Sequence, residues 1–313
     1  MFGLFGVRGG RSILPSMRSP LLLVLVLAGC ATAAPASQPE PVGATTPSAY
    51  RVYDSDGRPS SMDAIFAASR DVSAVLVGEE HDDEVGHAVE AELFDGVVRG
   101  AGSRPVALSL EMFERDVQTV VDEYLQGVIT EPYFLAAARP WPAYRTAYRP
   151  MVELARSRGL RVIAANAPRR YVNLATRVGV DSLSGLGAEA LRSLPPLPLP
   201  SPSDRYRLKF DSMMAEGGSH AGMPPHMFAG QRLWDAAMGN AVAAALYERP
   251  DALVVHYAGG FHVERRLGTA ESLLHFRPRT TFLVVAIRSA DDPASFLPVH
   301  EGLGDYVVLT QKR

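Results

Sequence analysis

Two histidines stand in the same short motif, a glycine followed three residues later by a histidine (GxxH). His81 ends the first motif, GEEH (78–81), and His262 ends the second, GGFH (259–262). Two imidazoles and one carboxylate are a common ligand set for a divalent metal ion with an open coordination position. Glu111, at the end of an apolar run, could supply the carboxylate. The sequence therefore predicts a metal site at His81, Glu111 and His262.

Such an ion would give the site hydrolytic chemistry. A bound divalent metal lowers the pKa of its water toward about 7, which makes a hydroxide nucleophile available. Glu111 or Glu80 would then be the catalytic residue that moves protons. One GxxH motif arises often by chance, and a histidine after a strand is more often a capping or hydrogen-bonding residue. The repetition of the motif favours a functional site over two turns that merely hold loops together.

Further acidic residues follow the first motif. Asp82, Asp83 and Glu84 are best explained as the acidic first turn of a helix over 83–100, where the helix dipole favours negative charge. His87 lies on the same turn and either faces a cleft, where it could contact a cofactor, or faces the solvent.

A pair of tyrosines offers a different chemistry. Tyr144 and Tyr148 are four residues apart, and an arginine follows each, Arg145 and Arg149. A nearby guanidinium eases the ionisation of a phenol, and a phenolate is a hard ligand for ferric iron, including haem iron. The competing interpretation, which the sequence alone favours, is an amphipathic helix over 145–158 whose aromatic side chains cover a sheet.

A third cluster lies in SHAGMPPHMFAGQRLWDAAM (219–238). Its histidines and first methionines could bind a soft metal such as copper: His220, Met223, His226 and Met227. The methionines fit better as part of an apolar helix stripe with Trp234 and Met238. His220 stays open as a cofactor contact.

The elements that must position these residues alternate along the chain. Five continuous apolar runs predict strands that are buried on both faces, at 72–78, 105–112, 161–167, 252–259 and 280–287, and 305–310 adds a final strand. Helical spacing occurs at 83–100, 116–127, 145–158, 204–216 and 228–248. This order predicts an α/β fold with a mostly parallel central sheet flanked by helices.

In such a sheet ligands bind beyond the carboxyl ends of the strands. Both GxxH motifs and Glu111 come at strand ends, so neighbouring strands would bring them to one edge. The segment of about 168–250 has no strand pattern and is predicted to be a helical insertion that caps the sheet.

Composition narrows the class of partner. The 313 residues carry a formal net charge of −3, and no run of basic residues could follow a phosphate backbone, so we expect no nucleic acid partner.

The N-terminus predicts export and a lipid anchor. Residues 1–29 are predicted to be a lipoprotein signal peptide, and LAGC (27–30) has the pattern of a lipidation site at Cys30. Residues 30–48 are predicted to be a disordered tether, and 49–313 the folded domain. We expect a lipid-anchored protein of the cell envelope, at the outer membrane facing the periplasm if the source has two membranes.

Five motifs in the same order resemble the ChaN-like haem-binding lipoproteins of the Tiki superfamily: GEEHDDEVGH (78–87), LEMFERDVQ (110–118), WPAY with YRPMVELARSRGLRVIAANAPR (141–169), SHAGMPPHMFAGQRLWDAAM (219–238) and AGGFHVERRLG (258–268). The superfamily also includes the Tiki proteases and, more distantly, erythromycin esterases. The family's paired GxxH motifs and strand-end glutamate correspond to His81, His262 and Glu111.

The resemblance implies haem as the cofactor, a tyrosine ligand to iron and a possible homodimer with stacked haems. It also implies, as an alternative, metal-dependent hydrolysis by Tiki relatives. Two departures stand out: Phe261 replaces a glycine of the second motif, and only one histidine, His87, occupies a position where family members often carry two. The leading hypothesis is a lipid-anchored haem- or iron-binding protein for uptake or storage, and the alternative is a metallohydrolase.

Overall fold

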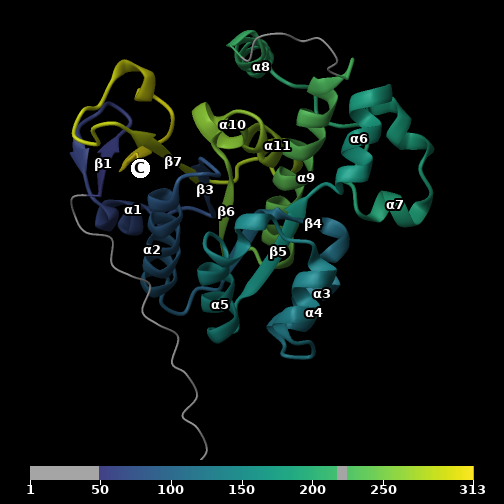
Figure 1. The fold of residues 1–313 in the computed structure, drawn as a ribbon, viewed down its shortest axis with the longest axis horizontal. Helices are drawn as coiled ribbons and strands as arrows, with labels where there is room; N and C mark the ends of the chain where they lie inside the picture. Colours follow the sequence, from purple (N-terminus) through teal and green to yellow (C-terminus); the bar gives the residue numbers. More distant parts are fainter. Residues whose placement is uncertain (1–48, 217–223, 313) are drawn as a thin grey trace, which may run out of the picture. The chain divides into compact units, whose positions relative to one another are not determined.

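A mixed sheet of eight strands lies at the centre of the structure, a computed structural model that describes residues 49–216 and 224–312 (Figure 1). The strands are β1 (Tyr50–Asp54), β2 (Pro59–Ser60), β3 (Ala74–Glu79), β4 (Val106–Glu114), β5 (Arg161–Asn166), β6 (Leu253–Gly259), β7 (Phe282–Ala290) and β8 (Tyr306–Gln311). Their order across the sheet is β2-β1-β8-β7-β3-β6-β4-β5. All neighbours from β8 to β5 are parallel, and β1 is antiparallel to β8 and β2. The predicted α/β fold with a mostly parallel sheet is confirmed.

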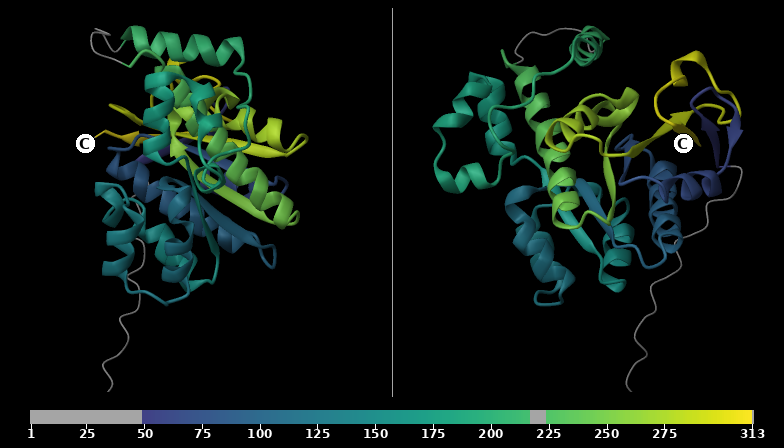
Figure 2. Two further views of the ribbon diagram at one scale, coloured as in Figure 1. Left: turned by 90° about the vertical axis from the view of Figure 1, so that its right-hand side faces the viewer. Right: turned by 180° about the vertical axis from the view of Figure 1, so that it is seen from behind.

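Helices pack on both faces of the sheet. One face contacts α1 (Met62–Ser69), α2 (Glu84–Gly100), α3 (Gln118–Leu125), α4 (Glu131–Ala138) and α5 (Arg149–Ser157). The other contacts α9 (Met227–Glu248) and α11 (Thr269–Phe276), and Figure 2 shows this arrangement from two further sides. Every residue of β3 is buried, because alternate side chains enter the two cores; Val75 and Val77 face α2, whereas Ala74 and Leu76 face α9. This explains why the strand reads as a continuous apolar run.

The predicted insertion contains no strand in its described part, 168–216 and 224–250; its regular elements are helices, and residues 193–203 between them are irregular. It contains α6 (Arg169–Val178), the 3-10 helix η3 (Val180–Gly185), α7 (Ala188–Arg192), α8 (Asp204–Glu216) and α9. Helix α9 is a main cover of the sheet, and Met238 is fully buried there, which supports its predicted core role.

Short helical turns complete the chain. They are η1 (Arg115–Val117), η2 (Pro142–Arg145), α10 (Gly260–Val263), η4 (Glu264–Arg266) and η5 (Pro298–His300). The helix predicted over 145–158 is wrong in extent, because η2 ends at Arg145 and α5 starts only at Arg149, with Pro150 in its first turn. Strand β1 was not predicted, since it is a short strand near the sheet edge with a partly exposed pattern.

Some sequence predictions fall on residues that the structure does not describe: the signal peptide, the tether with Cys30, and His220. Among the described residues no helix combines the length and apolar character needed to cross a membrane.

Strands β3, β6 and β4 are direct neighbours and run parallel. Their carboxyl ends therefore lie side by side at one edge of the sheet, which we call the ligand edge; it carries residues 78–81, 259–262 and Glu111.

Candidate functional site

Glu111 stands between the two GxxH histidines. Its Oε2 accepts a hydrogen bond of 2.7 Å from the Gly259 amide, and its Oε1 lies 3.7 Å from Nε2 of His262. A Cβ on Gly259 would lie 3.1 Å from Nε2 of His81 and 3.7 Å from Oε2 of Glu111. The fold thus brings His81, Glu111 and His262 together at the ligand edge. Their roles as metal or haem ligands stay predictions.

Each histidine is oriented by a second carboxylate. His81 donates from Nδ1 to Glu79 Oε1 at 3.0 Å, and His262 donates from Nδ1 to Asp235 Oδ1 at 2.8 Å. In His81 this leaves Nε2 without a hydrogen-bond partner among the described residues, whereas Nε2 of His262 lies 3.3 Å from the side-chain nitrogen of Gln231. A carboxylate on the far nitrogen of an imidazole is the arrangement that orients metal-binding histidines.

These carboxylates also set the histidine pKa values. The hydrogen bond to Glu79 raises the pKa of His81 above its ordinary value. Burial alone would lower the pKa of His262, but the negative charges of Asp235 and Glu111 outweigh it and raise that pKa.

The motif glycines are needed for close approach. A Cβ on Gly78 would lie 2.8 Å from Val263 Cγ2 and 2.9 Å from Gly260 Cα, and one on Gly259 would crowd the His81 ring. Neither glycine has a positive φ. These glycines are therefore needed because they leave room for the close approach of β3 and α10, and not because they allow a positive φ.

Glu79, the last residue of β3, is the centre of a buried polar network. It accepts hydrogen bonds from His81, from His87 Nε2 at 3.0 Å and from Tyr148 Oη at 2.6 Å. Burial alone would raise the pKa of Glu79, but these three donors lower it to about 2. Glu79 is therefore ionised at neutral pH and fixes the positions of its donors.

Asp235 has the matching role beside His262. It also accepts hydrogen bonds from Thr269 at 3.0 Å and from Tyr206. The sequence prediction did not identify Glu79 or Asp235 as site residues. A usable signal was present in both cases: Glu79 is the acid that ends the apolar run of buried strand β3, and Asp235 is a buried acid within helix α9.

Glu80 points to a different partner. Its carboxylate accepts hydrogen bonds from Arg288 Nη1 at 3.1 Å and from the amide and hydroxyl of Ser289 at 2.9 and 2.6 Å. These contacts attach the loop after β3 to β7. They do not support the predicted proton-transfer role of Glu80.

Arg145 and Arg149 do not make the neighbouring phenols easy to ionise: Arg149 lowers the pKa of Tyr144, but burial and nearby negative charges outweigh this effect. Tyr144 and Tyr148 are each only 2% exposed. Burial raises the pKa of both phenols, and the Glu79 charge raises that of Tyr148 further. Arg149 instead pairs with Glu131 through two hydrogen bonds, of 2.6 and 3.1 Å.

The surroundings of the two phenols agree with the alternative interpretation that these aromatics cover the sheet. Tyr144 packs against Phe113 and Phe134, and its hydroxyl has no hydrogen-bond partner in the described part of the chain. Tyr148 donates to Glu79 and packs against His87. His87 is itself buried, so the predicted exposed or cleft-facing position is wrong for this residue as well.

The exposed part of the site centres on His81, whose side chain is 50% accessible. The Trp141 ring meets the His81 ring edge to face, with ring centroids 4.7 Å apart. His262 is more enclosed: Phe261 and Trp234 lie against its ring. The larger Phe261 side chain that replaces the family's glycine also contacts Tyr206 and Lys209 of α8.

The fold and the site define an α/β protein with paired histidines and a glutamate at one sheet edge. Residues 65–273 match the model of a family described as haem-binding uptake, Tiki superfamily, ChaN. The match spans more than half of the chain, so the protein belongs to the ChaN family of haem-binding proteins. The predicted resemblance is confirmed. No protein in a curated set matches the chain.

Among solved structures, ChaN of Campylobacter jejuni, described for cofacial haem binding, superposes with a TM-score of 0.63 at 15% identity and covers 84% of this chain and 98% of its own. This likeness supports the fold. Two other solved structures match less well. The type III effector HopBA1 has a TM-score of 0.44 at 12% identity and covers 80% of this chain and 94% of its own. A mutant of the erythromycin esterase EreC has a TM-score of 0.44 at 11% identity and covers 84% of this chain and 83% of its own.

Proposed function

We propose that this protein binds haem at the ligand edge, with Nε2 of His81 as a ligand to the iron, and that it serves haem uptake or storage. The observation that carries the proposal is the state of His81. Its ring is half accessible, its Nδ1 is held by the buried Glu79 carboxylate, and its Nε2 makes no hydrogen bond to any described residue. An oriented imidazole with one free nitrogen is a suitable axial ligand for haem iron.

The surroundings of His81 also suit a porphyrin. Trp141 adds an apolar aromatic surface beside the imidazole. Arg145 is exposed on η2, the turn that Trp141 precedes, and we expect it to pair with a propionate. When bound, haem would supply the iron, while the chain supplies the ligand, the apolar contact and the counter-charge.

A tyrosine ligand, as the family resemblance implies, needs a phenol that iron can reach. Tyr144 and Tyr148 do not meet this requirement because they are buried. Tyr171 is a better candidate: it lies on α6 just after β5, is partly exposed, and carries the Arg170 guanidinium 4.5 Å from its ring centroid.

The cellular context of the proposal comes from the N-terminal sequence. A lipid on Cys30 would hold the protein at the cell envelope, and the 30–48 segment would give the domain room above the membrane. A homodimer that shares stacked haems belongs to the same proposal.

Titration of the purified full chain with hemin tests the haem site. We expect a saturable Soret band whose position or intensity changes in His81→Ala. His275→Ala is the matched control, because His275 is exposed on α11, and it should leave the spectrum unchanged. No saturable Soret change in the wild-type protein, or identical spectra for His81→Ala and wild type, would contradict the proposal.

The alternative of a metal-dependent hydrolase is less well supported. The convergence of His81, Glu111 and His262 suits a metal ion. However, Glu80 is engaged by Arg288 and Ser289, and Oε2 of Glu111 is engaged by the Gly259 amide, which leaves Oε1 of Glu111 for proton transfer. Elemental analysis separates the two functions: a stoichiometric metal lost in both His81→Ala and His262→Ala would favour the hydrolase.

A further inference from the structure

A buried carboxylate that has no hydrogen-bond partner among the described residues lies near Glu79 of the ligand edge. Glu90, in the middle of α2, is 0% exposed, and neither of its carboxylate oxygens has a hydrogen-bond partner among the residues described. An unpaired carboxylate in a protein interior is costly unless a proton or a cation accompanies it. The haem site proposed above does not use Glu90.

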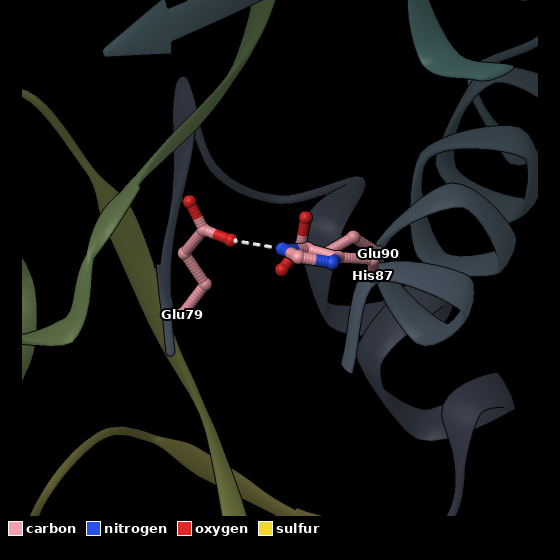
Figure 3. Close-up of side chains that lie close together, drawn as sticks. All are labelled: Glu79, His87 and Glu90. Atoms are coloured by element: carbon pink, nitrogen blue, oxygen red, sulfur yellow. Dashed lines mark hydrogen bonds and ion pairs between the residues drawn. The ribbon is translucent and has the colours of Figure 1, made fainter. Parts of the chain in front are cut away.

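Two further ligand groups surround this carboxylate. Figure 3 shows the Glu90 side chain beside the His87 ring, on the side that faces Glu79. One ligand atom from each of Glu79, His87 and Glu90 can be chosen so that all three lie within 4.8 Å of one another. The three residues come from two elements: Glu79 ends β3, whereas His87 and Glu90 are one turn apart on α2.

The hydrogen bonds of Glu79 leave one oxygen for this group. Oε1 accepts from both His81 and Tyr148, whereas Oε2 faces Nε2 of His87 at 3.0 Å. Two ligand atoms that are each about 2.1 Å from one ion lie between about 3.0 and 3.4 Å apart for octahedral to tetrahedral angles. Oε2 and Nε2 already have a spacing that one ion could bridge.

We propose that Glu79 Oε2, His87 Nε2 and a carboxylate oxygen of Glu90 form a second, buried site for a divalent transition-metal cation. The two carboxylates would neutralise the charge of the ion, and neutral His87 would supply the nitrogen ligand. One imidazole and two carboxylates suit Zn²⁺ or Mn²⁺. Tyr148 and His81 hold the other oxygen of Glu79 and so orient this ligand.

The site shares no ligand with the one predicted at His81, Glu111 and His262, although Glu79 belongs to the first GxxH motif and is hydrogen-bonded to His81. Its simpler competitor is a proton held between Glu79 and Glu90. That state fits their opposite pKa shifts, since burial and then the Glu79 charge raise the pKa of Glu90, while the three donors keep Glu79 ionised. A bound cation would displace this proton.

Metal-binding measurements on the purified full chain distinguish a bound cation from a shared proton. The chain is stripped with EDTA, titrated with Zn²⁺ or Mn²⁺ in separate experiments, and analysed by calorimetry and by elemental analysis after gel filtration. We expect one tightly bound ion per chain, at least tenfold weaker binding in Glu90→Gln, and a similar loss in His87→Gln. Circular dichroism establishes that both variants are folded.

Two further variants locate the ion. Glu84→Gln removes an exposed carboxylate from the same helix and should bind the ion like wild type. His262→Ala should also retain it. Wild-type protein that binds no ion, or Glu90→Gln with wild-type affinity, would overturn the inference in favour of the shared proton. Loss of the ion in His262→Ala, with retention in Glu90→Gln, would overturn it in favour of the GxxH site. Hemin binding is measured separately, so failure of either proposal leaves the other intact.

Discussion

Glu90→Gln is expected to make the metal-free protein more stable at neutral pH. Burial, and then the negative charge of Glu79, raise the pKa of Glu90 well above 4.5. The folded chain therefore keeps a proton on Glu90 that the unfolded chain releases above about pH 4.5. Because the folded state binds more protons than the unfolded state, the free energy of unfolding falls as the pH rises through this range.

The size of the effect follows from the length of that pH interval. One titrating group changes the free energy of unfolding by about 1.36 kcal/mol per pH unit. Above the ordinary value of 4.5, a Glu90 that stays protonated in the folded chain costs on the order of 1 kcal/mol for each further pH unit. Glutamine has nearly the same volume as glutamate and does not ionise, so the free energy of unfolding of the variant does not fall with pH through this group.

Urea unfolding in EDTA at pH 4, 5.5, 7 and 8, followed by circular dichroism, measures the difference. Wild type and Glu90→Gln should be nearly equal at pH 4, and toward pH 7 the variant should become more stable than wild type by on the order of 1 kcal/mol per pH unit. Glu84→Gln, on the exposed side of α2, should follow the wild-type curve. A difference between wild type and Glu90→Gln that is the same at every pH would refute the reasoning.

Three other substitutions test the surroundings of Glu79 and His81. Tyr148→Phe removes a buried donor to Glu79 and should lower the free energy of unfolding by about 1–3 kcal/mol. Tyr144→Phe removes a buried hydroxyl that has no hydrogen-bond partner among the described residues and should be neutral or stabilising in the same urea unfolding assay; equal losses in the two variants would contradict the assignment. Gly259→Ala places a Cβ 3.1 Å from the His81 ring and should cost about 1–3 kcal/mol. It should also shift the pKa of His81 in an NMR titration, and an unchanged titration curve would show that the ring has room.

The six strands β3 to β8 and their order in the chain could be predicted from sequence, because buried strands produce apolar runs that can be recognised without knowledge of the neighbours; β1 and β2 were missed. Strand β3 is an example, buried at every residue. Placing His81, Glu111 and His262 at strand ends also required only local patterns. The rule that ligands gather at the carboxyl edge of a parallel sheet then predicted their convergence.

The partners of the polar groups were decided only by the tertiary structure. No local pattern pairs Asp235 of α9 with His262, or directs Glu80 to β7, since these contacts join segments far apart in the chain. The same holds for Tyr148: its sequence neighbour Arg149 suggested an ionisable phenol, but the packing of α5 buries the phenol against Glu79.

The sequence by itself therefore determined which elements form and which residues reach the ligand edge, because backbone propensity and apolar periodicity are local properties. It did not determine which of those residues are accessible, charged or paired. Those properties depend on the solvent exclusion and electrostatic field at each atom, and helices such as α2, α5 and α9 set both only after they pack on the sheet.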